Sequence, residues 1–410
     1  MPAILFNNAR VFDGTSGDCP QGMQVLVEND LIREVSGKPI KAAEATVIDV
    51  CGRTLMPGLI DAHIHAYGSD VNVTRIAEHG ETYRAAYAAR MLGHALDCGF
   101  TTVRDVGGGD YGLSQALADG LIRGPRFLYS GKFLSMTGGH GDFRRLHEHD
   151  GMCACSAVHA MGHVADGVDQ VIRAAREELR RGAHCIKIMG SGGVASPTDP
   201  IWMNQYRDDE ISAIVHETVE RRSYTAAHCH PASAIRRCTA LGVRTIEHGT
   251  LIDPETAALV AKTGNFVIPT MVIIFGLVEL GRQLGFPAAS QEKAEIAARQ
   301  AMAGLEHMRQ AGVKMGFGTD LLGKLYTQQC REFTLRSEVF TPLEILQQAT
   351  SVNADALMLK GKLGCVAPGA YADLLVVDGD PLKDIQLLAA DGRNLKLIMR
   401  GGELVKNQLA

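Results

Sequence analysis

Short apolar runs alternate with amphipathic stretches through most of the chain. We expect strands that end near His65, Asp105, Ser130, Met189, His228, His248, Thr270 and Asp320. Between and after them we expect helices at 78–98, 112–122, 165–182, 208–221, 232–241, 253–263, 288–311 and 342–351. Such alternation predicts an α/β fold with a parallel sheet, and eight strands with eight helices predict a closed (β/α)8 TIM barrel. A doubly wound open sheet is the alternative, but its glycine fingerprint does not follow the first strand.

The two ends of the chain have a different pattern, in which short β-rich runs are separated by Gly, Asp, Asn and Pro. These runs are Ile4–Phe6, Ala9–Phe12, Met23–Val27, Leu31–Val35 and Thr46–Val50 near the start, and Ala372–Asp378 and Leu395–Gly402 near the end. Neither end alone has enough residues for a stack of sheets. We therefore expect one small β-sandwich domain from residues 1–56 and 359–410, beside a barrel of residues 57–358.

The composition indicates an ordinary globular protein and argues against some kinds of binding partner. Apolar residues make up 46% of the 410 residues and charged residues 21%, as in ordinary globular proteins. The net charge of −5 gives no reason to expect a nucleic acid or an anionic membrane as partner. No apolar run approaches the roughly 18 residues of a membrane helix, and the N-terminus lacks the pattern of a secretory signal. The 10 cysteines form no Cys-x-x-Cys pair, which favours reduced thiols and a cytoplasmic location.

Residue types that bind metals stand at the ends of several predicted strands. His63 and His65 end the first strand, and their spacing of two residues puts both imidazoles on one side of it. His228, His248 and Asp320 end later strands, and active sites of barrels lie at this rim. Each residue alone has a structural interpretation, as a hydrogen-bonded core histidine or a helix N-cap. Their joint placement favours a metal centre.

A lysine, Lys187, lies inside the apolar run of the fourth strand. Its side chain can reach solvent from such a position. It can also be held in the barrel beside the predicted metal ligands, where a buried lysine becomes chemically reactive.

These residues resemble the amidohydrolase superfamily over nearly the whole chain. The resemblance rests on Pro57–His65, Lys187, His228, His248-Gly249, Gly318–Asp320 and Gly364–Leu374. Within that superfamily, Lys187–Val194 and Tyr206–Glu210 are similar to the branch of imidazolonepropionase-like proteins and bacterial dipeptidases, which includes prolidases.

The resemblance implies a site with two divalent metal ions. His63, His65 and Asp320 would hold the more buried ion, and His228 and His248 the outer one. Lys187, carboxylated by carbon dioxide, would bridge both, since an ammonium group could not sit between two cations. A hydroxide shared by the metals would attack the substrate, with Asp320 carrying its proton to the leaving group. Zinc suits these ligands, although manganese and cobalt are not excluded.

The same residues separate the candidate reactions. Deaminases of this superfamily usually carry a glutamate three residues after the strand-five histidine, where this chain has Pro231, and they lack the lysine. Hydrolysis of an amide or peptide bond is therefore favoured, and within the branch we favour a dipeptidase for Xaa-Pro substrates, a prolidase. Cleavage before Arg or Lys is the alternative, but the loop carboxylates Asp142 and Glu148 lie beside two arginines. Another cyclic-amide hydrolase and a non-catalytic scaffold are further alternatives.

Two long connections, 132–164 and 321–341, are candidates for functional loops. His140 in the first can donate a hydrogen bond to the developing oxyanion, or can face water. The free carboxylate of a dipeptide requires donors, for which the candidates are Tyr206, His230, Arg144 and Arg145. Barrel enzymes of this kind often form homo-oligomers, although the sequence shows no interface signature.

Overall fold

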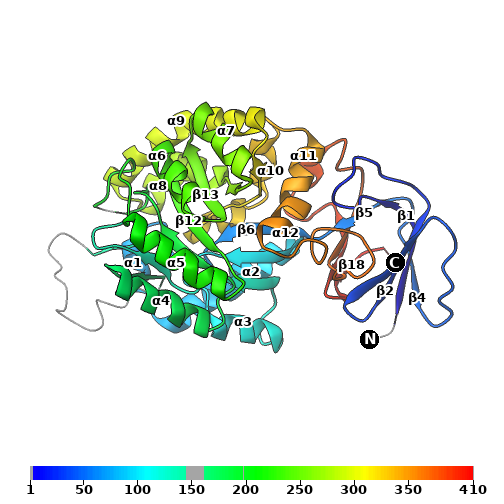
Figure 1. Cartoon of the computed structure of the whole chain (residues 1–410). Helices are drawn as coiled ribbons and strands as arrows, with labels where there is room; N and C mark the ends of the chain where they lie inside the picture. The colour runs from blue at the N-terminus through cyan, green and yellow to red at the C-terminus, as the bar shows by residue number, and fades with distance from the viewer. Residues whose placement is uncertain (1–2, 145–160, 197, 410) are drawn as a thin grey trace.

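The computed structural model describes residues 3–144, 161–196 and 198–409. Figure 1 shows a body in which helices surround central strands, and beside it a β-rich part that holds the first and the last strands. Within these described residues, no helix has the length and apolar character needed to cross a membrane.

Strands from both ends of the chain pair in the β-rich part. They are β1 (Ile4–Val11), β2 (Met23–Glu28), β3 (Leu31–Ser36), β4 (Thr46–Asp49), β5 (Thr54–Pro57), β16 (Leu374–Val377), β17 (Leu395–Arg400) and β18 (Glu403–Asn407). Their order is β18-β17-β16-β5-β1-β2-β3, with β4 paired to β1. The antiparallel pairing of β5 with β16 joins the two ends of the chain. A sandwich arrangement and the domain limits at 56/57 and 358/359 stay predictions.

The strand β16 lies between two hydrophobic cores. Leu374 and Val376 pack in the core of the β-rich part, whereas Leu375 and Val377 pack in the main core of the body. Successive side chains of a strand point to opposite faces. A strand that is buried on both faces therefore has an uninterrupted run of apolar residues in its sequence.

The body contains two parallel sheets. The first has the order β6 (Leu59–Ile64), β7 (Phe100–Asp105), β8 (Arg126–Tyr129). The second has the order β10 (Gly162–Val164), β9 (Phe133–Ser135), β11 (Ile186–Met189), β12 (Thr225–Pro231), β13 (Thr245–Leu251), β14 (Phe266–Ile268), β15 (Lys314–Met315). Backbone hydrogen bonds connect the sheets at two places: Ala62 N donates to Phe317 O (2.9 Å), and His184 N donates to Tyr129 O (2.8 Å). The predicted alternation of parallel strands and helices is confirmed.

Helices occur at every predicted position. They are α2 (Glu81–Asp97), α3 (Tyr111–Ala118), α4 (Val168–Arg180), α5 (Asp208–Glu220), α6 (Ala232–Ala240), α7 (Pro254–Thr263), α9 (Ala288–Ala311) and α11 (Pro342–Gln347). The last continues as a π-helical segment, Gln348–Val352, and then as α12 (Asn353–Ala356). The sequence analysis missed the short α1 (Val73–Ile76), and it missed α8 (Met271–Leu284), whose first residues are nearly all apolar. The connection 321–341 contains a 3₁₀ segment (Gly323–Gln328) and α10 (Arg331–Arg336).

Within the apolar stretch 56–65, the chain passes from β5 to β6 at Gly58. A Cβ atom at Gly58 would lie 1.9 Å from Thr101 Oγ1, so no larger residue fits without rearrangement. The backbone N–H of Gly58 donates to Asp373 O (2.8 Å), which ties this crossing point to the β-rich part. Conversely, the two runs predicted near the start form the single strand β1, with a register shift between Phe6 and Ala9.

Candidate active site

The ends of the first and last parallel strands bring together His63, His65 and Asp320. Asp320 N donates to His63 O (2.7 Å), which places the aspartate beside the end of β6. Asp320 Oδ1 lies 3.1 Å from His65 Nε2 and 3.4 Å from His63 Nε2. Asp320 has a φ of 56°, in the left-handed region that non-glycine residues seldom adopt. Backbone strain of this kind is concentrated at functional sites.

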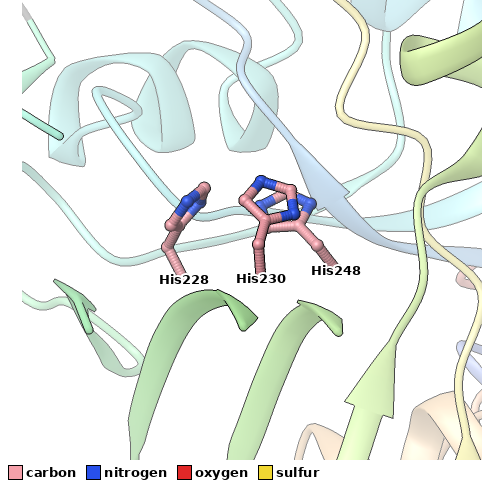
Figure 2. A group of neighbouring side chains, drawn as sticks. All are labelled: His228, His230 and His248. Carbon is pink, nitrogen blue, oxygen red and sulfur yellow. The ribbon is translucent and has the colours of Figure 1, made fainter. Parts of the chain in front are cut away.

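Three further histidines, His228, His230 and His248, form a second group (Figure 2). One ring nitrogen from each lies within 4.8 Å of the others. His228 and His230 project from β12 and His248 from the neighbouring β13, where Cys229 is its register partner. The rings of His248 and His63 are 4.8 Å apart, so the two groups form one continuous site. His248 also has a left-handed backbone, with a φ of 72°.

Protein groups hold the Nδ1 atom of four of these imidazoles. The contacts are His63 with Glu247 Oε2 (2.8 Å), His65 with Gly107 O (3.1 Å), His230 with Thr250 Oγ1 (3.1 Å) and His248 with Thr270 Oγ1 (2.8 Å). This arrangement leaves Nε2 as the ligand atom of each ring, and in His65 that atom contacts Asp320 Oδ1, another candidate ligand. His228 is reversed, since its Nε2 lies 3.3 Å from Gly192 O.

The residues present fit a metal centre on two grounds. His63 Nε2 is buried and forms no well-directed hydrogen bond among the described residues, with Asp320 Oδ1 3.4 Å away, while Glu247 fixes the ring through Nδ1. Carboxylate or carbonyl contacts to the second nitrogen are typical of metal-bound histidines. Burial lowers the pKa of His228 and His248, and lowers that of His230 to about 3. These rings are therefore neutral, which is the form that binds metals.

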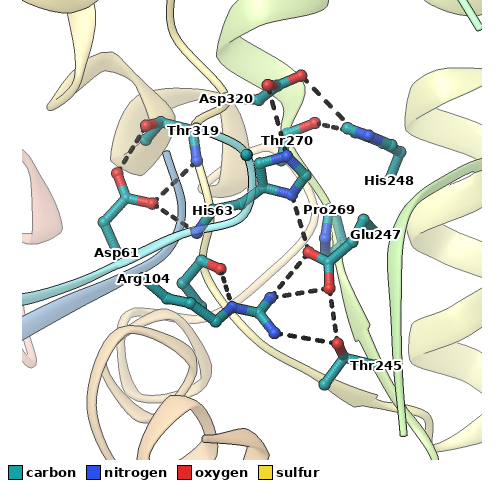
Figure 3. A network of polar contacts seen from close by, with 12 residues as sticks. Asp61, His63, Arg104, Thr245, Glu247, His248, Pro269, Thr270, Thr319 and Asp320 are labelled. Atoms are coloured by element: carbon teal, nitrogen blue, oxygen red, sulfur yellow. Dashed lines mark hydrogen bonds and ion pairs between the residues drawn. The ribbon is translucent and has the colours of Figure 1, made fainter. Parts of the chain in front are cut away.

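A buried ion pair lies behind His63 (Figure 3). Arg104 Nη2 donates to both oxygens of Glu247, at 2.8 and 2.9 Å, and Thr245 Oγ1 donates to Oε1 at 2.6 Å. Burial alone would raise the pKa of Glu247, but the Arg104 charge and the contact with His63 lower it to about 2. The Glu247 carboxylate is thus ionised and orients His63. The sequence analysis missed Glu247 and Arg104, although charged residues inside the apolar runs of β13 and β7 were a usable signal.

Lys187 lies on β11, is only 1% exposed and faces the cavity that contains the two groups. Burial lowers the pKa of its ammonium group. Losing the ammonium proton therefore costs less here than in water, and the neutral amine has a lone pair and hence nucleophilic character.

The cavity encloses about 700 Å³ of space free of protein atoms, including the part open to solvent. Its polar lining is formed by the two histidine groups, Asp320, Lys187 and His140. Its apolar lining is formed by Val73, Phe133, Phe143, Met161, Met189, Val194, Ala195, Ile273, Ile274, Leu277 and Leu322. Asp320 is the sole acidic residue among the described lining residues.

His140, expected at the oxyanion, lies in this cavity. Its ring stacks on His228 with centroids 4.2 Å apart. His140 Nδ1 lies 2.7 Å from Ser196 Oγ and 3.5 Å from Asp199 Oδ2. These two residues fix the ring and leave Nε2 available to a ligand.

Two of the predicted substrate-binding residues, Arg144 and Tyr206, lie away from the cavity. Arg144 pairs with Asp142 through two hydrogen bonds of 2.7 and 2.6 Å, and neither residue lines the cavity. Tyr206 is buried in the main core, also outside the lining. Its hydroxyl has no hydrogen-bond partner within the described residues. Arg145 and Glu148 fall outside the described residues. Of the three candidates that the structure describes, only His230 lines the cavity.

The chain matches the amidohydrolase family over residues 54–405 and belongs to that family. It is 30% identical to the ochratoxinase of Aspergillus niger over 364 residues, which cover 86% of this chain and 75% of that protein.

Solved structures place the chain in the prolidase-like branch of the superfamily. A crystallised amidohydrolase with 47% sequence identity superposes with a TM-score of 0.97, covering 100% of both chains. A prolidase crystallised with N-methylphosphonate-L-proline is 43% identical, with a TM-score of 0.96, covering 99% of this chain and 100% of that one. The chain is therefore similar to hydrolases over its whole described length.

Proposed function

We propose that this protein is a dipeptidase that cleaves Xaa-Pro dipeptides with the help of two divalent metal ions. The observation that carries the proposal is the convergence of two histidine groups, one with Asp320, on a cavity that also buries Lys187. We also propose that the eight strands β6–β8 and β11–β15 close into a TIM barrel, which the hydrogen bonds between the two sheets support.

His63, His65 and Asp320 would hold one ion, and His228 and His248 the other. Two zinc ions bound there would polarise the scissile carbonyl and make the attacking water acidic enough to react at neutral pH. The mixed imidazole and carboxylate ligands suit zinc, and also manganese or cobalt.

Lys187 would link the two groups as a carbamate. Its neutral amine adds to carbon dioxide, forming an N–C bond and releasing one proton, and the product is a carboxylate at the end of the lysine side chain. The low pKa that burial imposes on the ammonium favours this reaction. An anionic bridge also suits a position between two cations, where an ammonium group would be repelled.

Asp320 would move the proton. Burial alone would raise its pKa, but contacts with His63 and His65 hold it well below the usual value, so its carboxylate is ionised. We assign to it the acceptance of the proton of the attacking water and its delivery to the departing nitrogen. His140 Nδ1 contacts Ser196 and Asp199, so a proton on Nε2 can be donated to the carbonyl oxygen.

The cavity favours proline over a basic residue at the C-terminal position of the substrate. Its lining is largely apolar, and Asp142, the described loop carboxylate that could have received a cation, is already paired with Arg144. The prolidase that resembles this chain binds a phosphonate derivative of L-proline. His230, whose Nδ1 is held by Thr250, is the cavity residue we assign to the substrate carboxylate.

A library of dipeptides with free C-termini tests the specificity. We expect hydrolysis of Xaa-Pro dipeptides by the zinc-loaded protein and no hydrolysis when the proline carboxylate is amidated. Asp320→Asn protein prepared in parallel controls for contaminating peptidases. If the protein cleaves only dipeptides that end in Arg or Lys, or only cyclic amides, the Xaa-Pro assignment is wrong. If the protein binds two metal ions and hydrolyses none of these substrates, a non-catalytic scaffold is favoured.

A further inference from the structure

A second cluster of metal-binding side chains lies outside the active-site cavity. Cys98 follows α2, Cys330 precedes α10, and Asp391 lies in the segment between β16 and β17. One carboxylate oxygen and the two sulfur atoms all lie within 4.8 Å of one another. His94, one turn before Cys98 on α2, places its Nε2 3.5 Å from Cys98 Sγ. None of these residues lines the candidate active site.

We propose that Cys98, Cys330 and Asp391, with His94 as the fourth donor, form a zinc site separate from the active site. In a tetrahedral zinc site, bonds of about 2.0–2.3 Å put neighbouring ligand atoms roughly 3.3–3.8 Å apart. The separation of His94 Nε2 and Cys98 Sγ already lies in that range. The other two donors, Cys330 Sγ and an Asp391 oxygen, lie within 4.8 Å of Cys98 Sγ and of each other, so small side-chain rotations bring them into that range. His94 is not a member of this 4.8 Å group and has to turn further toward Cys330 and Asp391.

The surroundings favour a thiolate-bound cation. Both thiols are buried, at 1% and 0% exposure, and both are free rather than joined in a disulfide. Hydrogen bonds from Cys330 and from His94 lower the pKa of Cys98 to about 6. The hydrogen bond with Cys98 and burial raise the pKa of Cys330 well above its ordinary value, so Cys330 would lose its proton only as an ion binds.

The ligand set selects the metal and suggests its role. Two thiolates, an imidazole and a carboxylate suit Zn²⁺ far better than the hard cations Mg²⁺ or Ca²⁺. Four protein donors leave no open position for a substrate, as in structural zinc sites. Asp391 is exposed, so an ion can enter from solvent. A zinc ion here would fix the segment between β16 and β17 to the ends of α2 and α10.

Cobalt provides a readout that does not depend on activity. Because none of the proposed active-site ligands is a cysteine, a thiolate-to-cobalt charge-transfer absorption would report on this cluster alone. We would express the full chain in Co²⁺-supplemented medium and record the absorption spectrum and the metal content. We expect the band in the unaltered protein, and its loss together with one metal per chain in Cys98→Ser/Cys330→Ser.

Two further variants keep the test decisive. Cys238→Ser removes a thiol from another buried cysteine pair, Cys229 and Cys238, and should retain the band. Asp391→Asn changes an exposed side chain and should leave the circular dichroism spectrum unchanged. It should raise the Co²⁺ concentration at which the charge-transfer band reaches half of its maximal absorbance. The proposal is overturned if cobalt-loaded protein lacks the band or if the double variant keeps it. A Cys98–Cys330 disulfide in protein purified without reductant, found by mass spectrometry, would overturn it equally.

Discussion

His63 Nδ1 lies 2.8 Å from Glu247 Oε2, although 184 positions separate the two residues in the chain. Glu247 is in turn held by Arg104 from a third strand, β7. Both oxygens of the carboxylate are therefore occupied, and the imidazole has one orientation in which Nε2 faces Asp320. The buried pair of Arg104 and Glu247 therefore sets the direction in which His63 Nε2 points toward a bound ion.

Replacing Glu247 by Gln should weaken metal binding without removing a metal ligand. The neutral amide leaves the Arg104 charge uncompensated and no longer polarises His63. We expect the affinity for zinc to fall by about 10–100-fold, measured by competition with a chelator. Glu332→Gln is the matched control, because Glu332 also forms a fully buried pair, with Arg336 at 2.7 Å, but lies outside the cavity lining. Equal losses of zinc affinity in the two variants would show that Glu247 only stabilises the fold and has no specific role in metal binding.

Asp320→Asn should abolish turnover while the protein stays folded. The amide can still offer an oxygen to a metal but cannot accept the proton of the attacking water. We expect kcat on Xaa-Pro dipeptides to fall by about 10²–10⁴-fold, with thermal unfolding little changed. Asp142→Asn, at a carboxylate paired outside the cavity, controls for loss of charge. An Asp320→Asn rate close to that of the unaltered protein would remove Asp320 from the path of the proton.

His140→Ala should lower kcat more than it raises KM, because the hydrogen bond to the carbonyl oxygen strengthens as that oxygen becomes anionic. The expected loss is about 10²–10³-fold in kcat, measured on the best dipeptide. His307→Ala is the control, since His307 contacts Ile252 O and lies outside the cavity lining. A rise in KM at unchanged kcat would instead assign His140 to ground-state binding.

Protonation of Asp199 in acid should lower the free energy of unfolding of the metal-free protein. Burial alone would raise its pKa, but His140, Ser196 and Lys293 lower it from 3.8 to about 2. A lowered folded-state pKa stabilises the fold above the unfolded value and loses this effect as the pH falls from about 4 to about 2. The stabilisation is about 2 kcal/mol at neutral pH. Unfolding of unaltered and Asp199→Asn protein should therefore differ at pH 6 and converge near pH 2, and a pH-independent difference would contradict this.

Much of the site followed from strand periodicity. Residues two apart on a strand share a side, which paired His63 with His65 in advance, and strand ends of parallel sheets meet at one rim. The same spacing joins His228 with His230, which the sequence analysis assigned to the substrate alone. The structure groups His230 with the possible metal ligands His228 and His248. Applied consistently, the rule would have predicted this.

Other features depend on contacts that no local pattern records. The partners of Glu247 come from β6 and β7, more than a hundred residues earlier. The helix α8 is apolar around most of its circumference near its start, so a 3.6-residue period is not visible there. The crossing at Gly58 is set by the approach of Thr101 from another strand. Each of these is a tertiary constraint rather than a local preference.

Crystals of zinc-loaded protein test the central claim most directly, through anomalous diffraction at the zinc edge and the electron density at Lys187. The account predicts two peaks about 3.5–4 Å apart, one beside His63, His65 and Asp320 and the other beside His228 and His248. Continuous density should extend from Lys187 Nζ to both peaks, as a carbamate requires. A single peak in the cavity, or an unmodified Lys187 in contact with neither ion, would contradict it.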